Sequence, residues 1–209
     1  MTTVPVELWR RADDEFVEGT LHTALMPSDL TLLERSWGEA RDRLLKELEL
    51  AEVPRADRPQ SLHWDWREKA DELKLLEARC FGVLCGDAWQ AAMLTRTAAN
   101  VSRLDESKGK PLVYIEYLEV APWNWKVKPL DRRGEYGGLG RLLFRQAVVQ
   151  SVEEGFAGRV GLHALHQAES FYAALGMRRI SLDDAKRLPY YELSAGDAQE
   201  MLNNEGGAS

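Results

Sequence analysis

Three glycines lie between a strand-like segment and an amphipathic segment, in residues 135–141, which read EYGGLGR. The preceding residues, 112–120, are rich in β-branched and aromatic side chains, which predicts a strand. The residues that follow Gly140 place apolar side chains at helical spacing. Glycines at the start of a helix let a ligand approach backbone N–H groups that lack intrahelical partners. Together with the helix dipole, these donors predict a site for an anion that carries phosphate groups.

Two common phosphate-binding motifs do not fit this glycine loop. A Walker A loop needs Lys followed by Ser or Thr after its last glycine, where this chain has Arg141 and Leu142. A dinucleotide fingerprint needs a third glycine three residues beyond Gly140, where the chain has Leu143. A glycine-rich turn without a ligand is the structural alternative. The loop lies in a basic window, because residues 126–145 contain six basic and two acidic residues.

The loop resembles the acetyl-CoA signature of the GNAT N-acetyltransferase superfamily, Gln/Arg-x-x-Gly-x-Gly/Ala. It departs from that pattern at the first position, where Glu135 replaces Gln or Arg. A second segment, residues 168–177, reads AESFYAALGM and resembles the family segment Ala-x-x-Phe-Tyr-x-x-x-Gly-Phe. The family often has Asn three residues before this alanine, where this chain has Leu165. Both segments occur in the family's order between Leu112 and Gly176.

The resemblance implies a fold, a cofactor and a set of contacts. The implied fold is α/β of GNAT type: a central mixed, mostly antiparallel sheet, a splayed parallel fourth and fifth strand, and helices on both faces. Acetyl-CoA is the implied co-substrate, and its pantetheine arm is expected to pair with the backbone of the fourth strand. The expected cofactor-binding residues are Leu118, Glu119, Val120, Tyr136, Gly137, Gly138, Leu139, Gly140 and Arg141.

Acetyl transfer to an amine requires a group that takes the amine proton and a group that protonates the departing thiolate. The resemblance implies that Tyr172 is the acid, with packing beside the cofactor as its alternative role. Glu116 is the first candidate for the base, His163 the second and Glu119 the third. Glu116 could instead pair with a neighbouring arginine, and His163 could be a hydrogen-bonded core histidine. Direct attack without an acyl-enzyme is expected.

Composition and charge restrict the classes of partner. The chain has 209 residues, is 44% apolar and carries a formal net charge of −7. This charge disfavours nucleic acid and favours a cationic amine substrate. No apolar run approaches the ~18 residues of a membrane span, and residues 1–11 do not resemble a signal peptide. The two cysteines, Cys80 and Cys85, suit buried thiols in a reducing cytoplasm, and no metal site is expected.

The rest of the chain predicts a single domain, residues 1–209, with an N-terminal helical extension over about 1–60. Residues 1–26 show no clear periodicity, whereas a capped helix is expected from Pro27 to about Leu50. A short helix from Trp64 to Ala70, a hairpin over residues 76–97 and a fifth strand over 159–164 should follow. Beyond Met177, the sequence predicts two closing antiparallel strands, a last helix over 195–202 and fraying from Asn203.

An N-acetyltransferase is therefore the first hypothesis, and a GNAT-fold module that binds acyl-CoA or a partner without turnover is the second. The sequence leaves the amine acceptor and a possible homodimer open. It also leaves open whether the N-terminal segment or residues 122–130 contact substrate. Trp123 and Trp125 in this second segment could hold a cation or cover the edge of the core.

Overall fold

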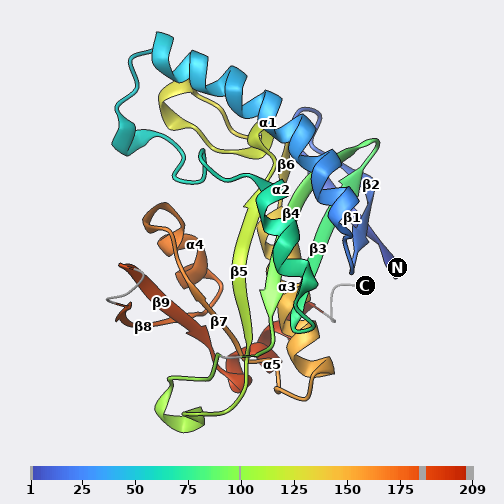
Figure 1. Cartoon of the computed structure of the whole chain (residues 1–209), viewed down its shortest axis with the longest axis vertical. Helices are drawn as coiled ribbons and strands as arrows, with labels where there is room; N and C mark the ends of the chain where they lie inside the picture. Colours follow the sequence, from blue (N-terminus) through green and yellow to red (C-terminus); the bar gives the residue numbers. More distant parts are fainter. Residues whose placement is uncertain (1, 99, 184–186, 206–209) are drawn as a thin grey trace. The chain divides into compact units, whose positions relative to one another are not determined.

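The computed structural model describes residues 2–98, 100–183 and 187–205, and shows a mixed α/β fold (Figure 1). The strands form one nine-stranded sheet in the order β6-β1-β2-β3-β4-β5-β7-β9-β8. Strands β5 and β7 are parallel, and the other strand pairs with a described register are antiparallel. The predicted fold class is thereby confirmed. The strands are β1 Thr3–Arg10, β2 Glu15–His22, β3 Ala78–Cys85, β4 Ala88–Arg96, β5 Val113–Val120, β6 Tyr136–Gly137, β7 Val160–His163, β8 Arg178–Asp183 and β9 Leu188–Leu193.

Among the described residues, five α-helices and six short 3-10 helices accompany these strands. The α-helices are α1 Pro27–Leu50, α2 Trp66–Lys69, α3 Leu139–Glu153, α4 Glu169–Ala174 and α5 Ala195–Glu205. The 3-10 helices are η1 Arg55–Asp57, η2 Ala70–Lys74, η3 Asp105–Ser107, η4 Pro122–Asn124, η5 Lys128–Leu130 and η6 His166–Ala168. The predicted helices, hairpin and closing strands all form. Helix α5 continues to Glu205, so fraying does not begin at Asn203, and residues 206–209 lie outside the described residues.

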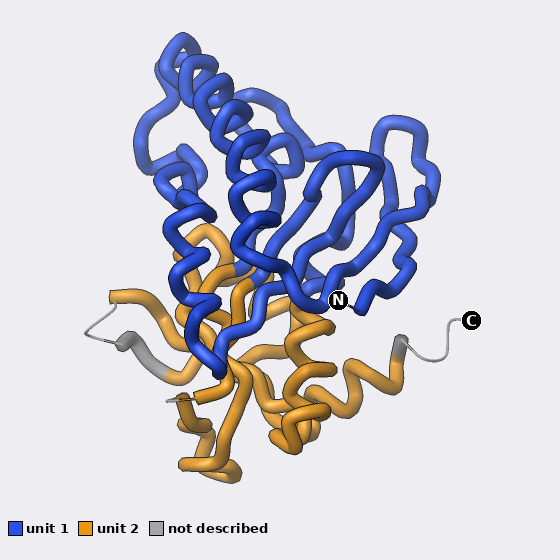
Figure 2. The backbone as a smooth tube through the Cα atoms, turned by 45° about the vertical axis from the view of Figure 1, so that its right-hand side comes forward, with its two compact units in different colours: residues 1–93, 118–143 blue, residues 94–117, 144–209 orange. Residues whose placement is uncertain are grey.

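The chain divides into two compact units (Figure 2). Unit 1 comprises residues 1–93 and 118–143, and unit 2 comprises residues 94–117 and 144–209. Strands β4 and β5 and helix α3 each contribute residues to both units. The sequence predicted one domain, and this division of the contacts was not foreseen.

The N-terminal residues differ from the predicted helical extension. Strands β1 and β2 form an antiparallel hairpin in which Thr3 pairs with His22 and Arg10 with Glu15. The helical part of this region begins only at Pro27. There, the Asp29 carboxylate accepts the backbone N–H of Met26 at 2.7 Å, which caps α1 as expected.

Helix α1 buries one face in the core of unit 1. Its core side chains follow the predicted helical spacing, and the indole of Trp37 donates a 2.9 Å hydrogen bond to the carbonyl of Trp89 on β4. The buried residues of α1 are Leu30, Leu33, Glu34, Trp37, Arg41, Leu44 and Leu48. Glu34 and Arg41 are the charged members of this set, and they form an ion pair with each other.

Candidate functional site

The glycine loop of unit 1 leaves its backbone open to approach at Gly138. Gly138 adopts a φ of +80°, and a Cβ added there would meet no atom within 4 Å. The N–H of Leu142 donates to the carbonyl of Gly138 at 3.0 Å, in the first turn of α3. The N–H groups just before Leu142 therefore begin the helix without intrahelical acceptors. A ligand can approach this backbone without meeting a side chain at Gly138.

A buried amide network fixes the start of the loop. The N–H of Tyr136 donates to Oδ1 of Asn124 at 2.9 Å. The amide nitrogen of Asn124 donates to the carbonyl of Gln90 and to its Oε1, at 3.2 and 3.0 Å. Tyr136 was expected to offer its N–H to the cofactor, but in this structure Asn124 already accepts it. Donors for an anion are thus expected only after Gly137, because Gly137 itself pairs with Trp9 of β1.

The β1–β2 hairpin supports the loop from the side of Gly137. Strand β6 pairs with β1, so that Trp9 lies opposite Gly137. A Cβ at Gly137 would lie 2.5 Å from Cε3 of Trp9 and 3.1 Å from Nη2 of Arg11, so only glycine fits. The guanidinium carbon of Arg11 lies 4.7 Å from the centre of the Trp9 ring. Arg11 therefore adds positive charge beside the loop, and the sequence motifs gave no signal for it.

The two tryptophans of the link between β5 and the loop belong to the core edge of unit 1. The indole of Trp125 donates to the carbonyl of Val120 at 2.9 Å, and its ring packs with Leu44, Leu48, Val53 and Val127. The indole of Trp123 donates to Oε1 of Gln90 at 2.8 Å. Both indole N–H groups thus form hydrogen bonds within the protein, as expected if the two tryptophans cover the edge of the core.

Glu119 of β5 is the most perturbed carboxyl group of unit 1. It is 4% exposed, and its Oε2 accepts the indole N–H of Trp66 at 2.6 Å. Its Oε1 is buried without a well-formed hydrogen bond. Burial raises the pKa of Glu119 to about 7, although Trp66, Ser61, Arg41 and Lys69 favour the charged carboxylate. This carboxyl group can exchange a proton near neutral pH.

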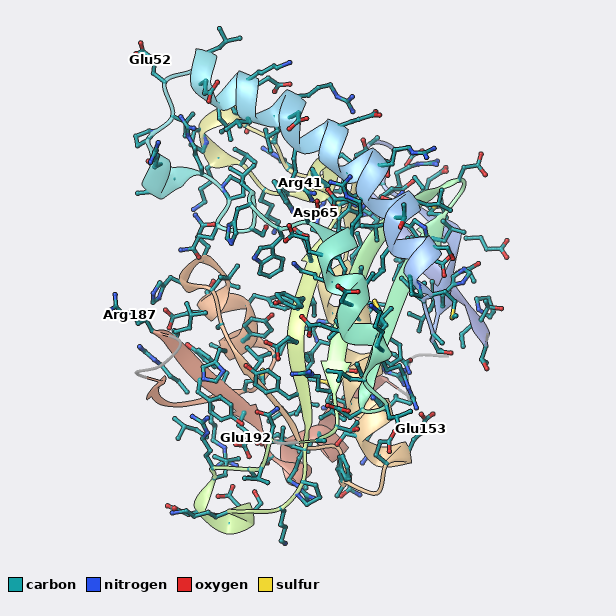
Figure 3. The ribbon with its side chains drawn as sticks, in the orientation of Figure 1. Arg41, Glu52, Asp65, Glu153, Arg187 and Glu192 are labelled. Atoms are coloured by element: carbon teal, nitrogen blue, oxygen red, sulfur yellow. The ribbon has the colours of Figure 1, made fainter. Side chains whose placement is uncertain are left out.

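A pocket of about 270 Å³ lies between α1 and residues 62–67 of unit 1. Arg41 and Asp65, which both line it, lie close together in Figure 3. Its charged lining is largely paired internally, because Glu34 binds Arg41 and Asp65 binds Arg67. Glu119 does not line this pocket. The lining residues are Glu34, Gly38, Arg41, Asp42, Leu45, Leu62, His63, Trp64, Asp65 and Arg67.

Tyr172 of α4 lies in the core of unit 2. Its side chain is largely buried, and its ring centre lies 6.4 Å from that of Phe144, 5.1 Å from that of Phe171 and 6.3 Å from that of Tyr191. Burial raises the pKa of the Tyr172 hydroxyl well above its ordinary value, so the group stays protonated at neutral pH. Within the part of the chain that the structure describes, no group forms a hydrogen bond with this hydroxyl, which is also not one of the fully buried polar atoms without a partner.

The other two candidate bases lie on strands of unit 2. Nδ1 of His163, at the end of β7, lies 2.6 Å from the Tyr114 hydroxyl, and its ring centre lies 5.1 Å from that of Tyr190. These contacts fit the alternative role, a hydrogen-bonded core histidine. Glu116 is half-buried on β5. Their roles in proton transfer stay predictions.

The cysteines and the helices give no further site. Cys80 is buried, and burial raises the pKa of its thiol. The thiol of Cys85 lies 3.6 Å from the Tyr136 hydroxyl. Within residues 2–98, 100–183 and 187–205, no His, Cys, Asp and Glu side chains gather as a metal site would require. Among the helices of the described residues, none combines the length and apolarity needed to cross a membrane.

Comparison with known proteins identifies structural relatives only. No protein-family model and no curated protein sequence matches the chain. A proposed acetyltransferase of the GNAT family from Desulfovibrio desulfuricans matches with a TM-score of 0.53 and 14% identity, over 85% of this chain and 99% of that one. An acetyltransferase from Thermus thermophilus matches with a TM-score of 0.48 and 18% identity, over 83% and 96%. A mutant AtaT toxin, bound to acetyl-CoA and to the C-terminus of the antitoxin AtaR, matches with a TM-score of 0.49 and 13% identity, over 88% and 98%.

Proposed function

We propose that this chain, which has the fold of the GNAT acetyltransferases, transfers an acetyl group from acetyl-CoA to a primary amine. The fold is shared with proteins of very different sequence, so the function must be argued from the side chains and backbone groups of this chain. Three features support the proposal: the glycine loop, the hydroxyl of Tyr172 and the proton-exchanging carboxyl group of Glu119.

The glycine loop would hold the phosphates of acetyl-CoA. The backbone donors that follow Gly137 and the dipole of the fifteen-residue helix α3 attract a diphosphate, and Gly138 leaves the approach open. The backbone of Leu118–Val120 would pair with the pantetheine amides as an added strand does. The carbonyl of Val120 already accepts the Trp125 indole, so we assign the pairing mainly to the remaining backbone groups of this segment.

The observation that carries the proposal is the hydroxyl of Tyr172, which no described residue bonds although the rest of the side chain is largely buried. Because this hydroxyl is not one of the fully buried polar atoms without a partner, a ligand can reach it, and a thiolate leaving group would accept its hydrogen bond. The reaction begins when the neutral amine attacks the thioester carbonyl and the carbon–sulfur bond breaks. Tyr172 then gives its proton to the sulfur of coenzyme A and recovers one from solvent.

Glu119 is the base that we propose, in place of Glu116 or His163. A base acts best when its pKa lies near the working pH, and the pKa of about 7 meets that condition. The carboxylate is buried, so the amine proton would reach its Oε1 through a water molecule. We expect cationic amines to be favoured, because the chain carries a net charge of −7.

Titration calorimetry with acetyl-CoA tests the cofactor assignment. Gly138→Glu places a negative side chain where the diphosphate would lie, and should weaken binding by at least about tenfold. Gly86→Glu is the matched control, because Gly86 also has a positive φ, of 57°, and open space around it. Equal affinities of the two variants would remove acetyl-CoA from the glycine loop.

A further inference from the structure

Trp66 connects helix α1 to Glu119 through two hydrogen bonds in the core of unit 1. Its backbone N–H donates to Oε2 of Glu34 at 2.8 Å. Its indole N–H donates to Oε2 of Glu119 at 2.6 Å. These three residues are far apart in the sequence, and each is almost fully buried. Glu34 of α1 therefore holds in place the residue whose indole contacts the proposed base, Glu119.

The ring of Trp66 has little freedom to turn away from Glu119. Trp37 packs against it edge to face, with ring centres 6.0 Å apart and an interplanar angle of 85°. Nζ of Lys69 lies 5.9 Å from its centre. Glu34 in turn is held by its ion pair with Arg41. Backbone, ring and indole N–H of Trp66 are thus each fixed by a separate neighbour.

This arrangement distinguishes the two oxygens of the Glu119 carboxyl group. An indole N–H can only donate, so it occupies a lone pair of Oε2 and cannot take up a proton. Oε1 is buried without a well-formed hydrogen bond, which leaves it available to a proton. The Trp66 contact also favours the charged form, because it is a hydrogen bond to a carboxylate.

We propose that Trp66 is a positioning residue that orients the Glu119 carboxyl group and directs the substrate proton to its Oε1. The inference rests on the proposed function, in which Glu119 accepts the proton of the amine. Trp66 itself touches neither the amine nor acetyl-CoA in this account. Its contribution is to fix one oxygen and to stabilise the carboxylate form.

The charges around Glu119 set the pH range in which this contact matters. Arg41 on α1 and Lys69 on α2 favour the carboxylate, as does the Ser61 hydroxyl. Glu34 also faces this region, but it is paired with Arg41. Asp65, Glu68 and Glu72 interact with Lys69, whose own pKa is lowered by burial. Burial acts in the opposite direction, because it disfavours the charged form of Glu119.

The direct test follows the Trp66 indole by 15N–1H NMR on the full chain between pH 5 and pH 9, without substrate. The indole resonance should shift with a midpoint near pH 7, because its acceptor gains a proton. The shift should disappear in Glu119→Gln, which separates Glu119 from nearby histidines. A resonance that stays constant in the wild type would overturn the inference, whatever activity is found.

The functional test is the pH profile of coenzyme A release. Loss of the hydrogen bond in Trp66→Phe should raise the pKa of Glu119 and move the rising limb of the profile upward by about one pH unit. Trp64→Phe is the matched control and should not move it, since Trp64 lines the pocket beside α1, which Glu119 does not line, and phenylalanine keeps an aromatic ring beside Lys69. A rising limb at the same pH in Trp66→Phe and in the wild type would contradict the inference. A titrating indole in a protein that acetylates no amine would instead contradict the proposed function and leave the Trp66–Glu119 pair established.

Discussion

The carboxamide oxygen of Asn124 accepts the backbone N–H of Tyr136 at 2.9 Å, and this bond ties the glycine loop to the sheet of unit 1. Asn124 completes the link through its amide nitrogen, which donates to Gln90 on β4. Because the side chain is 6% exposed, water cannot readily replace these bonds. The conformation of the loop thus depends on a residue outside the glycine motif.

Asn124→Ala should weaken both stability and cofactor binding. The substitution leaves the N–H of Tyr136 without its partner, which should lower the free energy of unfolding by about 2 kcal/mol. Gln90 keeps a donor at each oxygen, because Trp123 bonds its Oε1 and the N–H of Ala121 bonds its carbonyl. The loop would then sample other conformations, so acetyl-CoA affinity should fall as well. Urea unfolding and calorimetry measure the two effects. Asn100→Ala serves as the control, because the Asn100 amide bonds only locally, to the carbonyl of Ala98. If acetyl-CoA binds Asn124→Ala as tightly as it binds Asn100→Ala, the loop does not need this anchor.

Glu119 should make the stability of the protein depend on pH. Its pKa rises from an ordinary 4.5 to about 7 on folding, so the folded state holds the proton more tightly than the unfolded state. This contribution is fully present below pH 4.5 and is lost as the pH rises through about 7. Over this pH range the free energy of unfolding should fall by about 3 kcal/mol. Urea unfolding at several pH values should show this fall in the wild type and not in Glu119→Gln. Parallel pH dependences of the two proteins would show that Glu119 has an ordinary pKa.

The three candidate bases can be separated by matched substitutions to glutamine. Glu119→Gln should reduce coenzyme A release by at least about 100-fold, because general-base catalysis contributes 10²–10⁴-fold. Glu116→Gln and His163→Gln should cost less, and each variant should be compared at saturating acetyl-CoA. If Glu116→Gln or His163→Gln shows the largest loss, the base was misassigned although the reaction can stand.

The elements next to the two glycine-containing segments could be predicted from the sequence, because each has strong local signals. Strand β5, helix α3 and helix α4 follow from side-chain periodicity and from their glycines. The hairpin of β1 and β2 was missed because its pattern is weak. Pro5 lies inside β1, where a proline disfavours a strand prediction, and Phe16 is exposed on β2, so apolar residues do not alternate cleanly. An edge strand tolerates such residues, and here β1 has only the two-residue strand β6 on its outer side.

The contacts that complete the candidate site depend on the tertiary fold. Glu34, Trp66 and Glu119 carry no common motif, and only the packing of α1 and α2 brings them together. Asn124 lies between two tryptophans in a link where the sequence analysis assigned roles to the tryptophans only. Glu119 was expected to contribute mainly its backbone and ranked third as the base. Its burial, and hence its raised pKa, could not be read from a strand pattern.

The most direct test of acetyl transfer is the rate of coenzyme A release from acetyl-CoA with a panel of amines, from polyamines to peptide N-termini. The wild type should acetylate at least one cationic member. Tyr172→Phe should bind acetyl-CoA normally but react at least about tenfold more slowly, because only the proton-donating hydroxyl is removed. Tyr191→Phe is the control, because it removes a hydroxyl from a neighbouring ring of the same aromatic cluster. The Tyr191 hydroxyl donates to Glu169 at 3.0 Å and has no proposed role in the reaction. If the protein binds acetyl-CoA tightly but acetylates no amine above background hydrolysis, the proposed acetyl transfer is contradicted and a binding module without turnover is favoured.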